Sequence, residues 1–305
     1  MTARSSKQEH TVRFTLVLSG GGLKGLAHVG VLRALAERGM QPSLVVGSSI
    51  GALVGASWAS GIPLDHLTQR ALEVRRRDIF QVAHYDMAFR RLLSPALYRR
   101  EPLDRLLRSV LSERTFHDLV HPLLVSTVDL NSGEQVVWGT PDRRDVRLAD
   151  AVFASCALPG IFPPREIGGR HYVDGAVVEN LPVRLAAQAA PDQPLLAINV
   201  AAATGVVRER VEEQGFAATY IRGLEIVMQS QISSHLRRWE GPPLLLVEPR
   251  VEHVSTFSFR HNADLLAEGY RATAAALEIV GGLDRLPPGF TYLAPEMPEG
   301  ETEAA

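Results

Sequence analysis

The chain has 305 residues, of which 46% are hydrophobic and 22% charged, and its formal net charge is −2. This size supports a single folded domain with a large core, and the nearly neutral charge excludes a general attraction to nucleic acid. One cysteine, Cys156, excludes an internal disulfide and is typical of a reducing compartment; we expect it to be a small buried residue.

The first predicted strand leads into a glycine-rich loop. Residues 1–12 are polar, lack the apolar stretch of a secretory signal and are expected to be disordered. The run Thr15–Leu18 predicts a buried strand, and residues 26–35 predict a helix. The loop between them places backbone amides at a helix N-terminus, where they can bind an anion. Its residues are Gly20, Gly21, Gly22, Leu23, Lys24 and Gly25.

Two kinds of anion fit this loop. The spacing of Gly20, Gly22 and Gly25 matches a dinucleotide-binding fingerprint, which also requires an acidic residue about 20 positions later. The second predicted strand ends in residues 45–49, which contain no carboxylate. A P-loop is excluded because Lys24 is followed by glycine rather than by serine or threonine. The remaining interpretation is an oxyanion hole for acyl transfer.

A second strand-turn-helix unit follows. Residues 44–46 predict a buried strand and residues 50–58 predict a helix of small residues. The turn between them matches G-x-S-x-G, in which small residues permit a sharp bend that exposes the central serine. The turn consists of Gly47, Ser48, Ser49, Ile50 and Gly51. Ser49 is therefore a candidate nucleophile, and a simple helix N-cap is the structural alternative.

Residues 63–119 form a long, arginine-rich helical region. Leucines alternate with the arginines, so the region could be an amphipathic cap over an acyl pocket or a contact to anionic lipid headgroups. An ordinary solvated helical face is the alternative. The basic residues include Arg70, Arg75, Arg76, Arg77, Arg90, Arg91, Arg99, Arg100, Arg105 and Arg108.

Further strands alternate with helical stretches along the rest of the chain. Strand patterns occur at residues 122–128, 135–138, 195–200 and 244–247. The alternation predicts a three-layer α/β/α domain over residues 13–285, with a mainly parallel central sheet and a site at the carboxyl ends of its strands. Residues 286–305 are acidic, and we expect a disordered tail. No apolar run approaches the ~20 residues needed to cross a bilayer.

The segment from 170 to 176 supplies a carboxylate. A short strand delivers Asp174 into a turn formed with Gly175 and Ala176. Asp-Gly is an ordinary turn signal, but an apolar, proline-containing loop at residues 154–164 precedes it, and Asn180 opens the next helix. Asn180 could support the Asp174 loop or serve as a helix N-cap.

These three segments, in this order and spacing, resemble the patatin-like phospholipase family, including the bacterial lysophospholipase and esterase relatives of neuropathy target esterase. The resemblance extends from about Phe14 to the helix around Tyr270. It implies a dyad without histidine, in which Ser49 is the nucleophile and Asp174 the base. It further implies that the glycine loop is the oxyanion hole. The family's aspartate is often followed by two glycines, whereas here Ala176 takes the second position.

Chemistry alone sets a requirement on this pair. A solvated aspartate with a pKa near ~3.9 is a poor base, so Asp174 must be partly desolvated, and the apolar loop at residues 158–164 is placed to do that. A Ser-Asp-His triad remains the competing arrangement, because His235, His253 and His261 all follow Asp174. We expect these three to be surface or packing histidines.

Other candidates have simpler explanations. We expect His28 to be a packed helix residue, with a place at the mouth of the site as the alternative, and Asp129 to belong to a hairpin turn. No spacing of histidines, cysteines and carboxylates indicates a metal, and no cofactor is predicted.

The predicted function is deacylation of a phospholipid or lysophospholipid. The alternatives are an acyltransferase with the same dyad, a nucleotide-binding or regulatory module that uses the glycine loop, and a degenerate hydrolase that binds a partner. We expect a cytoplasmic protein whose membrane contact is peripheral, at the inner face of the membrane. No nucleic-acid partner is expected, and the sequence does not indicate an oligomeric state.

Overall fold

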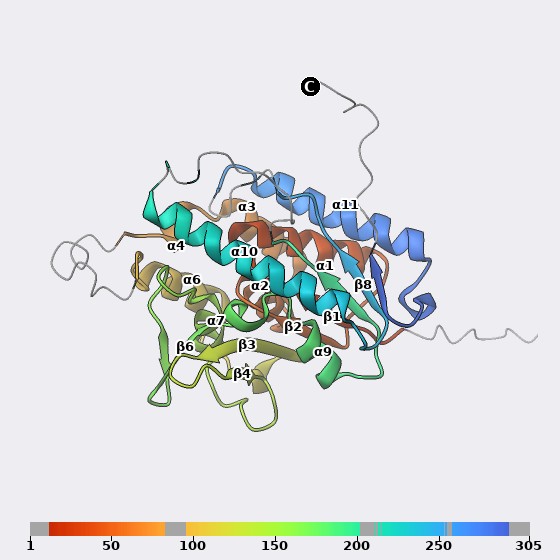
Figure 1. The fold of residues 1–305 in the computed structure, drawn as a ribbon, viewed down its shortest axis with the longest axis horizontal. Coiled ribbons are helices and arrows are strands. Elements are labelled where there is room, and N and C mark those ends of the chain that lie inside the picture. The colour runs from red at the N-terminus through yellow and green to blue at the C-terminus, as the bar shows by residue number, and fades with distance from the viewer. Residues whose placement is uncertain are drawn as a thin grey trace, which may run out of the picture.

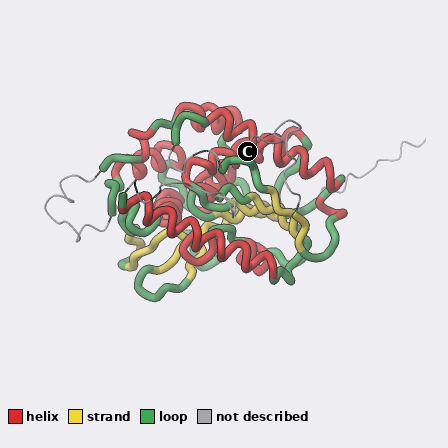
Figure 2. Tube along the Cα trace, turned by 45° about the horizontal axis from the view of Figure 1, so that its top comes forward, coloured by secondary structure: helices red, strands yellow, loops and turns green. Residues whose placement is uncertain are grey.

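The computed structural model of the chain describes residues 12–82, 96–201, 211, 213, 215–252, 254 and 258–292 (Figure 1). Within these residues the strands form one sheet, and helices cover both of its faces (Figure 2). Hydrogen-bonded neighbours follow the order β5-β6-β3-β2-β1-β7-β8-β9, and β4 also pairs with β3. The strands are β1 (Thr15–Leu18), β2 (Leu44–Gly47), β3 (Leu123–Asp129), β4 (Gln135–Trp138), β5 (Arg165–Ile167), β6 (Arg170–Asp174), β7 (Leu195–Ile198), β8 (Leu244–Val247) and β9 (Phe290–Tyr292).

The sheet is parallel along most of its width. β3, β2, β1, β7, β8 and β9 run parallel to their neighbours in this order, whereas β4 and β6 run antiparallel to β3, and β5 runs antiparallel to β6. β1, β7 and β8 are buried along their whole length, which is why their sequences are almost entirely apolar. The three-layer α/β/α architecture with a mainly parallel sheet is confirmed.

Alternate side chains of each strand face two different helical layers. Leu16 and Leu18 of β1 belong to one core cluster, and Val17 between them belongs to the other. The first face is covered by α1 (Ala27–Glu37), α2 (Ile50–Ala59), α3 (Leu64–Glu73), α6 (Glu101–Leu111), α7 (Leu148–Cys156) and α11 (Asn262–Val280). The second is covered by α9 (Val183–Ala189) and by α10 (Phe216–Arg237). Shorter elements are α4 (Arg76–Ile79), α8 (Ala176–Glu179), η1 (Gly22–Leu26), η3 (Phe116–Asp118) and η5 (Leu283–Arg285).

The region expected to form a cap divides into two parts. α3 belongs to the helical layer: Leu67 and Ala71 are buried in the main core, and Nδ2 of Asn262 donates to the carbonyl oxygen of Ala71 at 3.0 Å. α4 and α6 are the parts that approach the candidate site. Of the arginines in this region, Arg90 and Arg91 lie outside the described residues, as do all of residues 83–95.

The expectation of a disordered tail from residue 286 is wrong for its first residues. Leu286 is buried, and Phe290–Tyr292 form β9, which pairs with β8. The aromatic and β-branched side chains of this short segment favour a strand, and the open edge of β8 offers it backbone partners. Residues 293–305 lie outside the described residues, as do residues 1–11. In the part of the chain described, no helix is both long and apolar enough to cross a membrane.

Candidate active site

Two strands end close together on one edge of β3. Gly47, the last residue of β2, pairs with Val125, and Asp174, the last residue of β6, pairs with Thr127. Both Val125 and Thr127 also pair with β4, and a strand residue has one neighbour on each edge. β4 therefore occupies one edge of β3, while β2 and the antiparallel β6 share the other. Their chain ends face each other, so the residues that follow Gly47 lie beside Asp174.

The turn after β2 has the strained geometry that the G-x-S-x-G pattern predicts. Ser49 has φ 54° and ψ −126°, an unusual backbone conformation for a residue other than glycine. A Cβ at Gly47 would lie 2.7 Å from the backbone nitrogen of Ala52, and a Cβ at Gly51 would collide with the carbonyl oxygen of Leu18. The turn therefore requires small residues at both positions, and it presents the partly exposed Ser49 at the start of α2.

The glycine loop lies beside the Ser49 turn, and a hydrogen bond from α1 holds the residue that precedes the loop. His28 is fully buried and its Nε2 donates to the carbonyl oxygen of Ser19 at 2.9 Å. Burial lowers the pKa of His28 to about 4, so the ring is neutral and its role is packing. Gly21, Gly22, Leu23 and Lys24 line the same cavity as Ser49, whereas Gly20 and Gly25 pack behind them against Asn180 and Ile50.

Asp174 is 2% exposed, and its Oδ1 accepts a hydrogen bond from the Ser48 hydroxyl at 3.5 Å. Burial raises its pKa to about 7, and hydrogen bonds from the Ala176 N–H and from the hydroxyls of Ser49 and Ser48 oppose that rise. The Ala176 N–H donates to Oδ1 at 2.9 Å, and the Asp174 N–H donates to the carbonyl oxygen of Ala157 at 3.0 Å. The carboxyl group can therefore exchange a proton near neutral pH, which a solvated aspartate cannot do.

Ser49 and Asp174 share a cavity of about 120 Å³ whose walls are mostly apolar. The wall includes residues from α2, α4, α6, α10 and the loop that follows α7. Its apolar members are Leu23, Ile50, Leu53, Ile79, Phe80, Leu103, Leu158, Ile161, Phe162, Ala176, Ala201, Ile221 and Met228. Such a chamber suits an acyl chain whose ester carbonyl lies at Ser49.

Cys156 is partly buried, packs against the main core and lines this cavity, whereas we expected a buried residue. It is partly exposed and close enough to the pair to hydrogen-bond Ser49. Burial and the negative charge of Asp174 raise the pKa of the Cys156 thiol well above its ordinary value. The thiol therefore stays protonated at neutral pH and is a poor nucleophile.

One functional contact was not expected from the sequence. The backbone N–H of Ser49 donates to Oγ of Ser155 at 2.9 Å, and that hydroxyl donates to the carbonyl oxygen of Ser126 at 2.7 Å. Ser155 thus ties the turn to α7 and β3. The only signal for it is its place beside Cys156 at the start of the apolar loop, since the pairing with Ser49 spans 106 residues.

The described histidines that follow Asp174 have partners away from the cavity. His235 lies 3.9 Å from Glu179 and 3.4 Å from Arg184, and His261 lies 3.1 Å from Asp264. His253 lies outside the described residues. Asp129 belongs to a hairpin turn, where it accepts from the Asn131 N–H at 2.9 Å and pairs with Arg170 at 3.1 Å.

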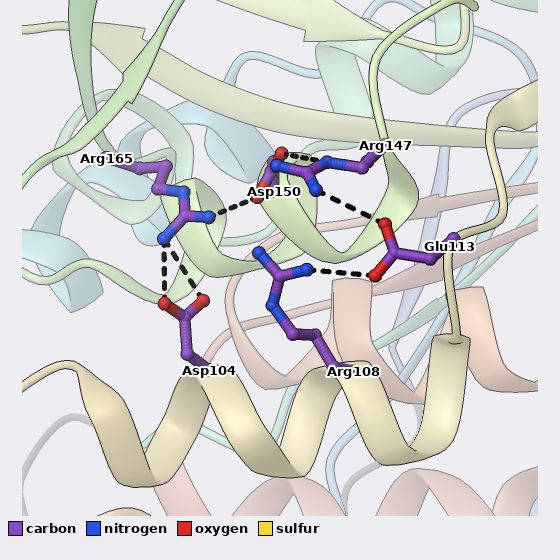
Figure 3. A network of polar contacts seen from close by, with 6 residues as sticks. All are labelled: Asp104, Arg108, Glu113, Arg147, Asp150 and Arg165. Atoms are coloured by element: carbon purple, nitrogen blue, oxygen red, sulfur yellow. Dashed lines mark hydrogen bonds and ion pairs between the residues drawn. The ribbon is translucent and has the colours of Figure 1, made fainter.

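A chain of ion pairs holds one wall of the cavity in place (Figure 3). Arg165 of β5 binds Asp104 of α6 at 3.0 Å and also binds Asp150 of α7. Arg147 extends the chain from Asp150 at 2.8 Å. The network consists of Asp104, Arg108, Glu113, Arg147, Asp150 and Arg165. It fixes α6, which carries the wall residue Leu103, against the helix that carries Ser155.

Known proteins share the sequence and fold that build this site. Residues 16–187 match the family model described as patatin-like phospholipase. An uncharacterised NTE family protein of Mycobacterium tuberculosis (strain ATCC 25618 / H37Rv) is 33% identical over 176 residues, which cover 56% of this chain and 44% of that protein. The patatin-like phospholipase domain-containing protein 6 of Mus musculus is 31% identical over 182 residues, or 56% of this chain and 12% of that protein. The chain thus spans less than half the length of these curated relatives.

A solved structure agrees on the architecture. VipD from Legionella pneumophila superposes with a TM-score of 0.51 at 16% identity, over 88% of this chain and 67% of that one. This likeness bears on the fold alone. The family model, in contrast, matches more than half of the residues and covers the glycine loop, the serine turn and the aspartate turn together. On that match, the chain is a member of the patatin-like phospholipase family.

Proposed function

We propose that this protein is a serine acyl-ester hydrolase that deacylates phospholipids or lysophospholipids through Ser49 and Asp174. The observation that carries the proposal is the Asp174 carboxyl group, which is buried and lines the same mostly apolar cavity as Ser49. Burial raises the pKa of this carboxyl group to about 7. Membership of a family of lipid acyl hydrolases supports it.

The first half of the reaction forms an acyl-enzyme. Asp174 accepts the hydroxyl proton while Oγ of Ser49 attacks the ester carbonyl carbon, and the carbonyl oxygen becomes an oxyanion. Backbone amides of Gly21 and Gly22 at the cavity wall stabilise that oxyanion. The tetrahedral intermediate then collapses, the ester C–O bond breaks, and Asp174 returns its proton to the departing alcohol.

The second half releases the acid. Asp174 takes a proton from a water molecule, which attacks the acyl-serine carbonyl and forms a second tetrahedral intermediate. Collapse of that intermediate breaks the bond to Oγ, and the proton on Asp174 returns to Ser49. Net hydrolysis consumes one water and yields a fatty acid and an alcohol. An acyltransferase would follow the same steps with a lipid alcohol in place of water.

The surroundings of the cavity support a lipid substrate at a membrane surface. Arg75, Arg76 and Arg77 are exposed and are separated by one residue, Asp78, from the wall residues Ile79 and Phe80. Exposed arginines this close in sequence to the wall of an apolar chamber can attract anionic headgroups while an acyl chain enters. We infer a cytoplasmic enzyme that contacts the inner face of the membrane peripherally.

Labelling with an alkyl fluorophosphonate tests the proposal. Wild-type protein should gain one adduct, which peptide mapping places on Ser49; Ser49→Ala should gain none, and Asp174→Asn should react more slowly. Asp174→Asn should lower ester turnover about 10²- to 10⁴-fold, the usual effect of losing a general base. A folded wild-type protein without adduct or esterase activity contradicts the proposal. Nucleotide-dependent thermal stabilisation would then favour the regulatory module.

A further inference from the structure

The side-chain amide of Asn180 lies buried in the cavity wall and has no hydrogen-bond partner among the residues that the structure describes. Asn180 is 1% exposed and lines the cavity together with Ser49, Gly21 and Gly22. Neither Nδ2 nor Oδ1 bonds to any of the residues that the structure describes. The backbone of the same residue is well fixed, because its carbonyl oxygen accepts the Gly20 N–H at 3.1 Å.

The amide lies beside the nucleophile. A Cβ built at Gly20 would overlap Oδ1 of Asn180 and would lie 3.1 Å from Cβ of Ser49. The side chains of Asn180 and Ser49 thus both border the space beside the Cα atom of Gly20. The Asn180 amide therefore lies close to the Ser49 side chain, and both residues line the cavity.

An unpaired buried amide lowers the stability of the fold, and no contact in the ligand-free protein offsets this loss among the described residues. A buried polar group without a partner destabilises the fold, and an apolar side chain of similar shape would avoid this cost. Asn180 carries two such atoms at a cavity that is otherwise mostly apolar. Its missing partner is best supplied by a ligand in that cavity.

The chemistry of the proposed reaction indicates which ligand atom the Asn180 amide binds. Asp174 and Ser49 already handle the proton, so the step that still needs help is the growth of negative charge on the carbonyl oxygen. A neutral amide can donate to that oxygen without competing with Asp174 for the proton.

We propose that Asn180 is a further catalytic residue whose Nδ2–H donates to the oxyanion, together with the amides of the glycine loop. This inference rests on the proposed function. Rotation of the amide about its last side-chain bond presents Nδ2 to the cavity while the backbone stays fixed by Gly20. Because the donor meets full negative charge only in the transition state, it should act on kcat more than on KM.

The test compares Asn180→Leu with the wild type on a soluble short-chain ester. We expect kcat to fall about 10²- to 10³-fold, the usual effect of losing one oxyanion donor, with little change in KM. The melting temperature should stay equal or rise, because the variant removes unpaired buried atoms. Asn180→Ser, which keeps a shorter donor, should recover part of the lost kcat and provides a second variant if leucine prevents folding.

Asn262→Leu is the matched control. That asparagine is also buried, but its Nδ2 donates to the carbonyl oxygen of Ala71, away from the cavity. We expect its replacement to lower the melting temperature and to leave kcat of the folded protein unchanged.

Two results overturn the inference. One is a kcat of Asn180→Leu equal to that of the wild type. The other is a kcat that falls only as far as the folded fraction of Asn180→Leu falls and that Asn180→Ser does not restore. If the wild type hydrolyses esters and Ser49→Ala does not, either result removes the role of Asn180 and leaves the proposed function intact. An inactive wild type that does not label removes both.

Discussion

The backbone N–H of Ser49 donates to Oγ of Ser155 at 2.9 Å. Since Ser155 in turn donates to Ser126 of β3 at 2.7 Å, one hydroxyl joins the strained turn to α7 and to the sheet. A residue held at positive φ persists only where its surroundings fix it, and this pair of bonds is part of that restraint.

Replacing Ser155 with alanine should loosen the turn. The Ser49 N–H would lose its partner, which should cost about 1–3 kcal/mol in the free energy of unfolding. The displaced nucleophile should lower kcat by about tenfold, because misplacement of a reacting group by a fraction of an ångström already affects the rate. Denaturant unfolding and steady-state kinetics measure the two effects. Ser57→Ala is the control, since that hydroxyl only donates to Leu53 within α2 at 2.8 Å; equal behaviour of both variants would refute the role of Ser155.

Activity should depend on the ionisation of Asp174. Its pKa is raised to about 7 by burial, and only the carboxylate accepts the Ser49 proton. We therefore expect kcat/KM to increase tenfold per pH unit below about pH 7 and to level off above it. The profile is measured with a substrate that does not itself titrate in this range. A plateau that continues down to pH 5 would contradict a base that titrates near pH 7.

The same pKa shift has a consequence for stability, with the opposite sign from most aspartates. Because the folded state holds the proton up to about pH 7 and the unfolded state loses it near ~3.9, the free energy of unfolding decreases as the pH rises between these values. Asp174→Asn should therefore raise the melting temperature at pH 8 and have little effect near pH 4.

Asp129→Asn is the control, because its expected effect on the melting temperature at pH 8 has the opposite sign. Hydrogen bonds from the Asn131 N–H lower the pKa of Asp129, so its carboxylate stabilises the folded state above the unfolded pKa. Its replacement should lower the melting temperature at pH 8. If Asp174→Asn lowers it as well, Asp174 is not destabilised by burial as we describe.

Of the residues in the ion-pair network of Figure 3, Arg165 is the most buried, and its replacement should destabilise the fold most. Arg165→Met leaves Asp104 and Asp150 without their shared partner, and removing one side of a buried pair typically costs about 3–5 kcal/mol. We also expect KM for long-chain esters to change, since α6 carries the wall residue Leu103. Thermal unfolding and chain-length kinetics provide the measurements. Breaking the exposed Arg33–Glu37 pair with Arg33→Met should have almost no effect; equal losses in both variants would contradict this account.

Binding to anionic vesicles should depend on the arginines near α4. Replacing Arg75, Arg76 and Arg77 with glutamine should weaken binding to phosphatidylserine-containing vesicles by up to about 100-fold at low salt, since each charge contributes about 1 kcal/mol. Hydrolysis of a soluble ester should be unchanged. Vesicle sedimentation measures the binding, and unchanged binding would remove these arginines from the interface. A triple replacement of exposed arginines on other helices is the control: Arg33, Arg38 and Arg271.

Much of the candidate site could be predicted from the sequence because its signals are local. The glycines before and after Ser49 are required by contacts of a single turn, and the Asp174 turn follows a strand of five residues. Such patterns show in a few consecutive residues. The family and the three-layer architecture followed from them and are confirmed, whereas the roles of Ser49 and Asp174 stay predictions until labelling and kinetics test them.

What the sequence could not predict depends on distant partners. β9 has three residues, and its pairing with β8 joins segments 46 positions apart at Leu244 and Phe290. The hydroxyl of Ser155 and the amide of Asn180 have types that occur at many ordinary positions. Only the fold reveals that the Ser155 hydroxyl holds the Ser49 turn and that the Asn180 amide has no partner in the described part of the chain.

One edge of β3 positions the candidate reacting groups, whereas other segments form most of the cavity walls that would select the substrate. The spacing between the serine turn and the aspartate turn is set by the short interval from Val125 to Thr127, while most of the chamber walls come from segments outside this strand. Insertions, deletions or grafts in the walls can therefore reshape the chamber without moving the reacting groups. A library that varies the wall residues Ile79, Phe80 and Leu103, at α4 and α6, is thus a direct route to new acyl-chain preferences on one constant reaction centre.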